Sequence, residues 1–260
     1  MTDYYKKIIE GLAAIEQEEG VRILYACESG SRAWGFPSKD SDYDVRFIYI
    51  RPVEWYLSIF DRRDVIERPI SNMLDMNGWD LKKTLNLFKK SNPTLLEWLQ
   101  SPISYMEPFS TAGKIRGLCA LTFSPRSCLY HYLHMARVNY RVYLQSAEVR
   151  IKKYFYVLRP ILACDWIERY QSMPPIQFDL LVERLVPSDS ELKAVIEQLL
   201  ERKKAGDELD YEPRINPINE YLEQRIAYFE NATSAVPASQ SWRDEELDEL
   251  FRSALQEVYP

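Results

Sequence analysis

Apolar side chains follow two different spacings in the first part of the chain. In residues 4–19 they recur every three or four positions between charged residues, which predicts an amphipathic helix ended by Gly20. Residues 21–27 and 43–50 are rich in β-branched and aromatic side chains, which predicts two strands. A polar loop that contains glycine, residues 28–41, joins them.

Further short strands are predicted at residues 64–70 and 73–77. A helix is predicted at residues 81–90, because Asp80 stands in the position of an N-cap. Strands and helices therefore mix over residues 1–122, and we expect an α/β (α+β) domain with a mixed sheet there.

Helical periodicity alone continues after residue 123. Ser124 and Pro125 form a cap followed by proline at the first helical position. The predicted helices cover residues 124–145, 151–170, 188–204, 217–231 and 242–258. We expect a second, all-helical domain over residues 123–260, with linker composition only at residues 231–241.

Composition places the chain among ordinary globular proteins. It has 260 residues, of which 46% are hydrophobic and 28% charged. No apolar run is long enough to span a membrane and no signal-peptide core is visible, so we expect a cytoplasmic protein without a membrane partner. The net charge of −6 argues against tight binding to duplex DNA.

The four cysteines are dispersed without a CxxC pair, which is typical of free thiols in a reducing compartment. Cys128, His131 and His134 supply three zinc-ligand types on one segment. No fourth ligand or partner cluster accompanies them, so we interpret this segment as a packed helix and not as a zinc site.

Asp42 and Asp44 open the second predicted strand and carry the clearest chemical signal. Side chains alternate along a strand, so these two carboxylates share one face while Tyr43, Val45 and Phe47 face the core. Carboxylates that close to each other require a cation. Mg²⁺, or Mn²⁺ in its place, suits hard oxygen ligands and leaves positions for phosphate oxygens.

Gly30 and Ser31 lie in the preceding loop and supply a second element. A glycine lets the backbone approach phosphate oxygens, and exposed N–H groups with a serine hydroxyl can hold a triphosphate. Arg32 adds a cation beside this turn.

Calcium-binding and phosphatase motifs that contain paired aspartates fit this sequence less well. A calcium EF-hand loop from Asp40 would need Gly at Val45 and Glu at Arg51. An aspartyl-phosphate phosphatase would place a hydrophobic strand before the pair, where this chain has FPSKDS. The sequence contains no P-loop. A nucleotide-sugar transferase stays chemically open, although it leaves Gly30 and Ser31 unexplained.

The segments SGSRAWGFPSKDSDYDVRFIYI, NGWDLKKTLNLFKKSNPTLLEWLQSPI and KKYFYVLRP resemble the RlaP (YcgL-like) family of predicted nucleotidyltransferases in the DNA polymerase β superfamily. Gly30-Ser31 and Asp42-Tyr43-Asp44-Val45 look like the superfamily signature hG[GS]…Dh[DE]h, with Ser29 in place of a hydrophobic residue. The resemblance covers roughly two-thirds of the chain, and the family is associated by name with RNA repair.

The resemblance implies a third carboxylate on a neighbouring strand that supports catalysis as general base. Two residues match the required setting. Asp75 lies between Leu74 and Met76 on a predicted strand, and Asp80 follows Trp79 and also fits a helix cap. We favour Asp75 and retain Asp80.

The helical domain is expected to cover the substrate nucleotide. Lys152, Tyr156 and Arg159 have helical spacing that predicts one face with two cations and a ring, able to contact phosphate and base. The resemblance extends over these residues. Lys153 could replace Lys152, and a solvated basic face explains the same spacing without a ligand.

The function expected from these observations is metal-dependent transfer of a nucleoside monophosphate from a nucleoside triphosphate to an acceptor hydroxyl, with release of pyrophosphate. The acceptor could be an RNA end, a tRNA, a protein or a small molecule. Two other classes stay open, a nucleotide-sugar transferase and a non-catalytic, antitoxin-like binding module on the same fold.

Overall fold

The computed structural model describes residues 3–207, 210–232 and 244–260. Its contacts divide the chain into two compact units. The first, which we call the sheet unit, comprises Met1–Ala33, Asp42–Thr122 and Gln240–Pro260. The second, the helical unit, comprises Trp34–Ser41 and Phe123–Ser239.

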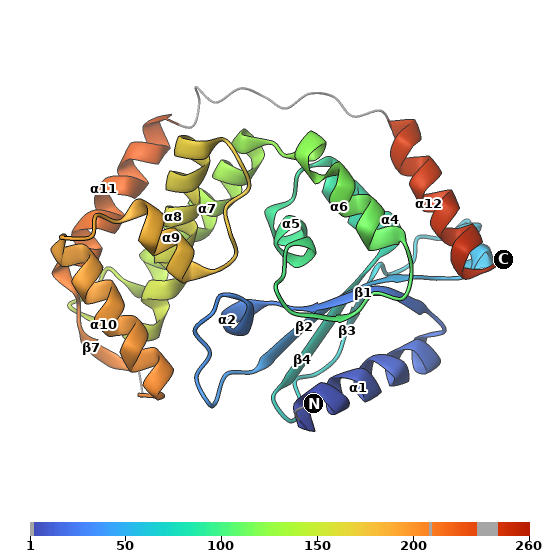
Figure 1. The fold of residues 1–260 in the computed structure, drawn as a ribbon, viewed down its shortest axis with the longest axis horizontal. Helices are drawn as coiled ribbons and strands as arrows, with labels where there is room; N and C mark the ends of the chain where they lie inside the picture. Colours follow the sequence, from blue (N-terminus) through green and yellow to red (C-terminus); the bar gives the residue numbers. More distant parts are fainter. Residues whose placement is uncertain (1–2, 208–209, 233–243) are drawn as a thin grey trace. The chain divides into compact units, whose positions relative to one another are not determined.

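A five-stranded mixed sheet forms the centre of the sheet unit, as the sequence predicts (Figure 1). Its strands are β1 (Arg22–Glu28), β2 (Tyr43–Ile50), β3 (Val65–Glu67), β4 (Leu74–Asp80) and β5 (Ser104–Met106). Their order is β3-β4-β2-β1-β5. Only β2 and β4 pair in parallel, and the other neighbours are antiparallel.

Helix α1 (Asp3–Glu19) covers one face of this sheet with the apolar stripe expected from its sequence. The stripe packs on alternate residues of the central strands, which form a buried core of Ile8, Leu12, Ile15, Ile23, Val45, Phe47, Tyr49 and Met76. Alternation along β2 therefore buries Val45 and Phe47 on this face, as predicted, and turns Asp44 and Arg46 to the other.

Gly78 of β4 allows a close contact beneath this core. A Cβ atom at this position would lie 2.0 Å from the ring of Phe47, so no larger residue fits without moving the ring. The glycine thus keeps β4 close beside β2.

Helices α4, α5 and α6 belong to the same unit. Helix α4 (Leu81–Lys89) begins at the predicted cap, where Asp80 accepts a hydrogen bond from the N–H of Lys82. Helix α5 (Pro93–Leu99) begins after Asn92, and α6 is Thr111–Thr122. Two short helices complete this set, α2 (Gly30–Ala33) and α3 (Val53–Tyr56).

The C-terminal helix α12 (Asp244–Val258) belongs to the sheet unit and not to the helical domain expected from the sequence. It contacts α4 and α6 (Figure 1), and its buried residues are Leu247, Leu250 and Ala254. Glu257 accepts hydrogen bonds from the backbone and hydroxyl of Ser110. Helical periodicity predicted the helix but carries no information on which domain the apolar face meets.

The helical unit contains five α-helices among its described residues: α7 (Pro125–Tyr143), α8 (Phe155–Tyr170), α9 (Phe178–Leu185), α10 (Glu191–Ala205) and α11 (Asn216–Ala232). A 3₁₀ turn, η1 (Ile151–Tyr154), leads into α8. The unit is not purely helical, because β6 (Glu148–Arg150) pairs with β7 (Tyr211–Pro213). These strands are too short to show a period in the sequence.

The segment Trp34–Ser41 leaves the sheet unit between its two signature motifs and packs in the helical unit. Phe36 is buried there, with ring centroids 4.7 Å from Phe155 and 5.5 Å from Phe178. The polar loop expected from the sequence therefore has an aromatic anchor at its centre.

Two sequence expectations concern residues that are described only in part. The predicted linker at 231–241 and the start of the predicted helix at 242 lie mostly outside the described residues. Within the described residues, no helix is long and apolar enough to cross a membrane.

Candidate active site

Asp44 and Asp75 face each other across the one parallel strand pair. The register of β2 and β4 places them directly opposite, so the two carboxylates share a face of the sheet. Arg46, two residues along β2, lies on the same face. Its Nη2 donates to Asp44 Oδ1 at 3.1 Å and to Asp75 Oδ2 at 2.8 Å. One guanidinium thus bridges both carboxylates.

Gly30 closes against Asp44 from the end of β1. Its φ of 60° lies in the left-handed region, and a Cβ atom there would lie 2.0 Å from Asp44 Oδ2. The N–H of Ser29 donates to the carbonyl of Asp44 at 2.8 Å. Gly30, the first residue of α2, is therefore packed directly on the carboxylate, with no room for a side chain.

Arg32 binds the segment that leads into β2. Its Nε donates to the carbonyl of Asp42 at 3.2 Å, and its guanidinium lies 3.7 Å from the ring centroid of Tyr43. Asp42 itself is exposed and precedes the first residue of β2. The structure thus gathers Gly30, Arg32, Asp42 and Asp44 in one neighbourhood.

Glu28 is a further member of this cluster that the sequence pattern did not single out. It is fully buried at the end of β1, accepts the N–H of Asp44 at 2.8 Å, and accepts a hydrogen bond from the hydroxyl of Tyr105. Burial raises the pKa of Glu28 to about 7, although both hydrogen bonds oppose the shift. The only sign of Glu28 in the sequence was that a charged residue directly follows the apolar strand predicted at residues 21–27.

The charges around Asp44 do not balance. Burial raises the pKa of Asp44, and the neighbouring carboxylates Asp75 and Asp42 add to this effect, while Arg46 and Arg32 oppose it. This environment disfavours the bare carboxylate, and either a proton or a nearby cation offsets that effect.

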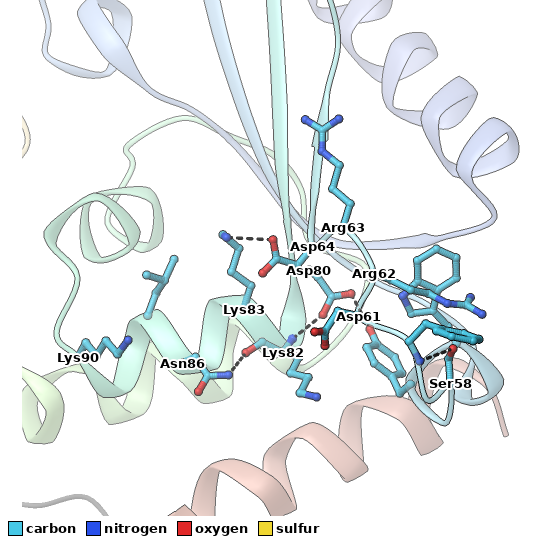
Figure 2. A pocket seen from close by; sticks show the side chains of 14 residues that line it. Ser58, Asp61, Arg62, Arg63, Asp64, Asp80, Lys82, Lys83, Asn86 and Lys90 are labelled. Carbon is cyan, nitrogen blue, oxygen red and sulfur yellow. Dashed lines mark hydrogen bonds and ion pairs between the residues drawn. The ribbon is translucent and has the colours of Figure 1, made fainter.

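Asp80 lies at the other end of β4 from Asp75. The two residues are five positions apart along the strand, which is a distance of about 17 Å. Asp80 is buried, caps α4 and accepts the hydroxyl of Tyr56 at 2.7 Å. It borders a cavity of about 420 Å³, shown in Figure 2, and takes no part in the Asp44 cluster.

The donor set suits a divalent cation without forming a complete cage. Asp44 and Asp75 direct oxygens at one bridging group, a position suited to hard cations such as Mg²⁺. Over the described residues, no group of three or more His, Cys, Asp or Glu side chains is arranged to hold a metal ion.

The basic stripe expected on α8 is formed only in part. Lys152 is exposed in the 3₁₀ turn and Tyr156 is exposed on α8, whereas Arg159 is only 2% exposed. The guanidinium of Arg159 packs 4.8 Å from the ring centroid of Trp34. A 3₁₀ turn has about 3.0 residues per turn and an α-helix about 3.6, so the spacing predicted for one continuous α-helix does not keep these residues on one exposed face.

Nearly the whole chain is similar to known proteins. Residues 5–253 match the model of the family described as "RlaP: RNA repair pathway DNA polymerase beta family". The chain belongs to this family. It is 54% identical over 254 residues to the "Uncharacterized protein YcgL" of Bacillus subtilis (strain 168), covering 98% of this chain and 97% of that protein.

One solved structure is similar over most of its length. It is a nucleotidyltransferase-like protein from Exiguobacterium sibiricum 255-15, 11% identical, and the match covers 96% of this chain and 87% of that one. The TM-score is 0.29, which is too low to support any argument about function. The family match places the chain in a DNA polymerase β family that is linked by its description to an RNA repair pathway.

Gly30→Ala tests the packing of the turn on Asp44. The substitution introduces both a strained backbone and a clash with the carboxylate, so we expect it to destabilise the protein by more than the ~1–2 kcal/mol of strain alone. Gly20→Ala is the matched control, because Gly20 has a φ of 62° and nothing within 4 Å of an added Cβ. Equal losses of unfolding free energy in the two variants would contradict the packing.

Glu28→Gln tests the buried carboxyl. Because its folded pKa is raised, the wild type loses up to about 3 kcal/mol of stability from this group as pH rises from about 4.5 to 7. Urea unfolding of Glu28→Gln across this range should lack that loss. Glu10→Gln, an exposed control on α1, should keep the wild-type pH dependence. A Glu28→Gln profile parallel to wild type would refute the assignment.

Proposed function

We propose that the protein is a metal-dependent nucleotidyltransferase that transfers a nucleoside monophosphate from a nucleoside triphosphate to an acceptor hydroxyl. The proposal rests on one observation above all. The glycine turn closes on Asp44, and Asp44 lies directly opposite Asp75. This combines a phosphate-binding turn with a carboxylate pair, which is what transfer at phosphorus requires.

Each residue of the cluster has a proposed role. Asp42 and Asp44 would hold Mg²⁺, or Mn²⁺, which when bound neutralises charge on the triphosphate and on the departing pyrophosphate. Gly30 and Ser31 would hold the triphosphate through backbone N–H groups and the hydroxyl. Arg32 would add a cation beside it.

We assign the third carboxylate to Asp75 and a structural cap to Asp80. The register of β2 and β4 supports this choice, since only Asp75 lies beside Asp44. Asp75 would accept the proton of the attacking hydroxyl. The acceptor oxygen then forms a bond to the α-phosphorus, the bond from that phosphorus to the bridging oxygen breaks, and pyrophosphate leaves.

An RNA end is the acceptor that the family supports best, because the family is described as part of an RNA repair pathway. The exposed Lys152 and Tyr156 remain candidates for contacts to the nucleotide. In this proposal Arg159 has a packing role instead, since its guanidinium is buried against Trp34.

Asp44→Asn tests the proposed function by thermal unfolding with each of the four ribonucleoside triphosphates, with and without Mg²⁺. At about a hundredfold excess over Kd, the preferred nucleotide should stabilise the wild type by about 2.7 kcal/mol. For a chain of this size that raises Tm by roughly 5–10 °C. The shift should require Mg²⁺ and be absent in Asp44→Asn.

Two further variants separate the candidate third carboxylates in the same experiment. Asp75→Asn should lose most of the shift. Asp80→Asn keeps a side-chain oxygen that can still cap α4, so it should keep the full nucleotide-dependent shift. The wild type failing to respond to any triphosphate would favour the non-catalytic binding module.

A further inference from the structure

Arg46 occupies the position between the two facing carboxylates. Its side chain is 18% exposed, and those of Asp44 and Asp75 are each 28% exposed. Besides the two carboxylate contacts, its Nη1 donates to the carbonyls of Asp75 at 2.9 Å and Val45 at 3.1 Å. Four hydrogen bonds therefore hold this guanidinium across β2 and β4.

A guanidinium in this place competes with any metal. It is a cation, and it contacts one oxygen of each carboxylate. A metal bound by either of these two oxygens would have to replace its contact with Arg46. The metal therefore binds less favourably, by the free energy with which Arg46 stabilises the metal-free carboxylates.

We propose that Arg46 is an internal counter-cation that keeps Asp44 and Asp75 paired in the metal-free protein and weakens metal binding until a triphosphate arrives. The inference rests on the proposed function. A triphosphate brings anionic oxygens with which the released guanidinium can pair, and it supplies ligands to the metal. Arg46 is thus a positioning residue that couples metal binding to nucleotide binding.

Mn²⁺ titration followed by electron paramagnetic resonance tests this coupling without requiring turnover. In the absence of nucleotide, Arg46→Gln should bind Mn²⁺ about tenfold more tightly than wild type, because the competing charge is gone. Arg46→Lys keeps the charge and should stay close to wild type. Arg63→Gln, which removes an equal charge from the exposed Arg63–Glu67 pair, is the matched control and should not change affinity.

Thermal unfolding gives a second readout on the same variants. In EDTA, Arg46→Gln should be less stable than wild type, since two facing carboxylates lose their cation. Saturating Mn²⁺ should reduce that difference. A merely structural arginine would leave the difference unchanged by metal.

The outcomes separate this inference from the proposed function. Mn²⁺ affinity in Arg46→Gln equal to or weaker than wild type overturns the counter-cation role, while the Asp44-dependent nucleotide shift still supports the transferase. Absence of both Mn²⁺ binding and that shift in wild type overturns both proposals.

A second, independent feature is the cavity at the far end of β4, formed by the segment after α3 and by α4 (Figure 2). Three acidic residues line it, Asp61, Asp64 and Asp80. Five cationic residues line it, Arg62, Arg63, Lys82, Lys83 and Lys90. The cavity therefore carries an excess of positive charge in a protein whose net charge is −6.

Part of this positive charge is not neutralised locally. Lys83 pairs with Asp64 at 3.0 Å, and Arg63 pairs with Glu67. Lys82 and Lys90 have no acidic partner among the described residues. Lys82 lies in the first turn of α4 and Lys90 directly follows its last residue, and Figure 2 shows both among the residues that line the cavity.

The same cavity has an exposed aromatic ring. The ring of Phe60 lines the cavity and is 74% exposed, and its neighbours in sequence Leu57 and Ile59 are 74% and 91% exposed. Cations and an exposed ring in one cavity suit a single-stranded nucleic acid, for its phosphates and its bases respectively. A cavity of this size suits one nucleotide unit better than a duplex surface.

We infer that this cavity binds a single-stranded part of the RNA acceptor, away from its reacting end. The inference rests on the proposed function for the choice of RNA. The distance of about 17 Å along β4 keeps this site separate from Asp75. Changes in the cavity should therefore leave the nucleotide response intact.

Fluorescence anisotropy with a labelled single-stranded ribo-oligonucleotide tests the site. Lys82→Gln combined with Lys90→Gln should weaken binding about tenfold and lower the slope of log K against log salt by about 1.4, for two lost phosphate contacts. Phe60→Ala should weaken binding at least about fivefold. Lys6→Gln with Lys7→Gln on α1, an equal charge change, should have little effect.

The Mg²⁺- and nucleotide-dependent Tm shift is measured on the same variants and should equal wild type. Oligonucleotide binding that is unchanged in the cavity variants, or absent in the wild type, overturns this site and leaves the transferase proposal standing. A wild type that shows no nucleotide-dependent Tm shift would overturn the transferase proposal itself.

Discussion

The parallel pairing of β2 with β4 is the constraint on which the rest of the site depends. Adjacent strands lie about 4.8 Å apart, so opposite residues bring their side chains together. Here the opposite residues are Asp44 and Asp75, both partly buried. Two carboxylates in that arrangement need positive charge, and Arg46 supplies it from the same face. The two carboxylates and the one guanidinium together leave one net negative charge at the centre of the site.

The end of β1 fixes Asp44 from the other side. Glu28 accepts its N–H, and Gly30 leaves no space between the turn and its carboxylate. The glycine of the signature is therefore a packing requirement as well as a candidate phosphate contact. Between the two motifs the chain passes through the helical unit, where Phe36 anchors it. The segment between Gly30 and Asp44 therefore depends on the packing of both units, since its two ends belong to the sheet unit and its middle to the helical unit.

Local chemistry accounts for what the sequence could predict. Three features depend only on residues close together in the chain, and each was predictable. They are the alternation along residues 43–50, the cap at Asp80 and the amphipathic stripe of α1. Strand order and register are long-range properties, so the sequence could not show that Asp75 lies opposite Asp44 or that Glu28 accepts the N–H of Asp44. The same holds for α12, whose apolar face could have met either unit. The sequence favoured Asp75 over Asp80, and the register adds that only Asp75 lies opposite Asp44.

Following labelled phosphate through a complete reaction tests the central claim most directly. Protein, Mg²⁺, acceptor RNA and a nucleoside triphosphate labelled either at the α- or at the γ-phosphate are incubated together. A nucleotidyltransferase centred on Asp44 and Asp75 places the α label on the acceptor and releases the γ label in pyrophosphate, and Asp75→Asn does neither. Transfer of the γ label to the acceptor, or transfer by Asp75→Asn at the wild-type rate, would contradict it.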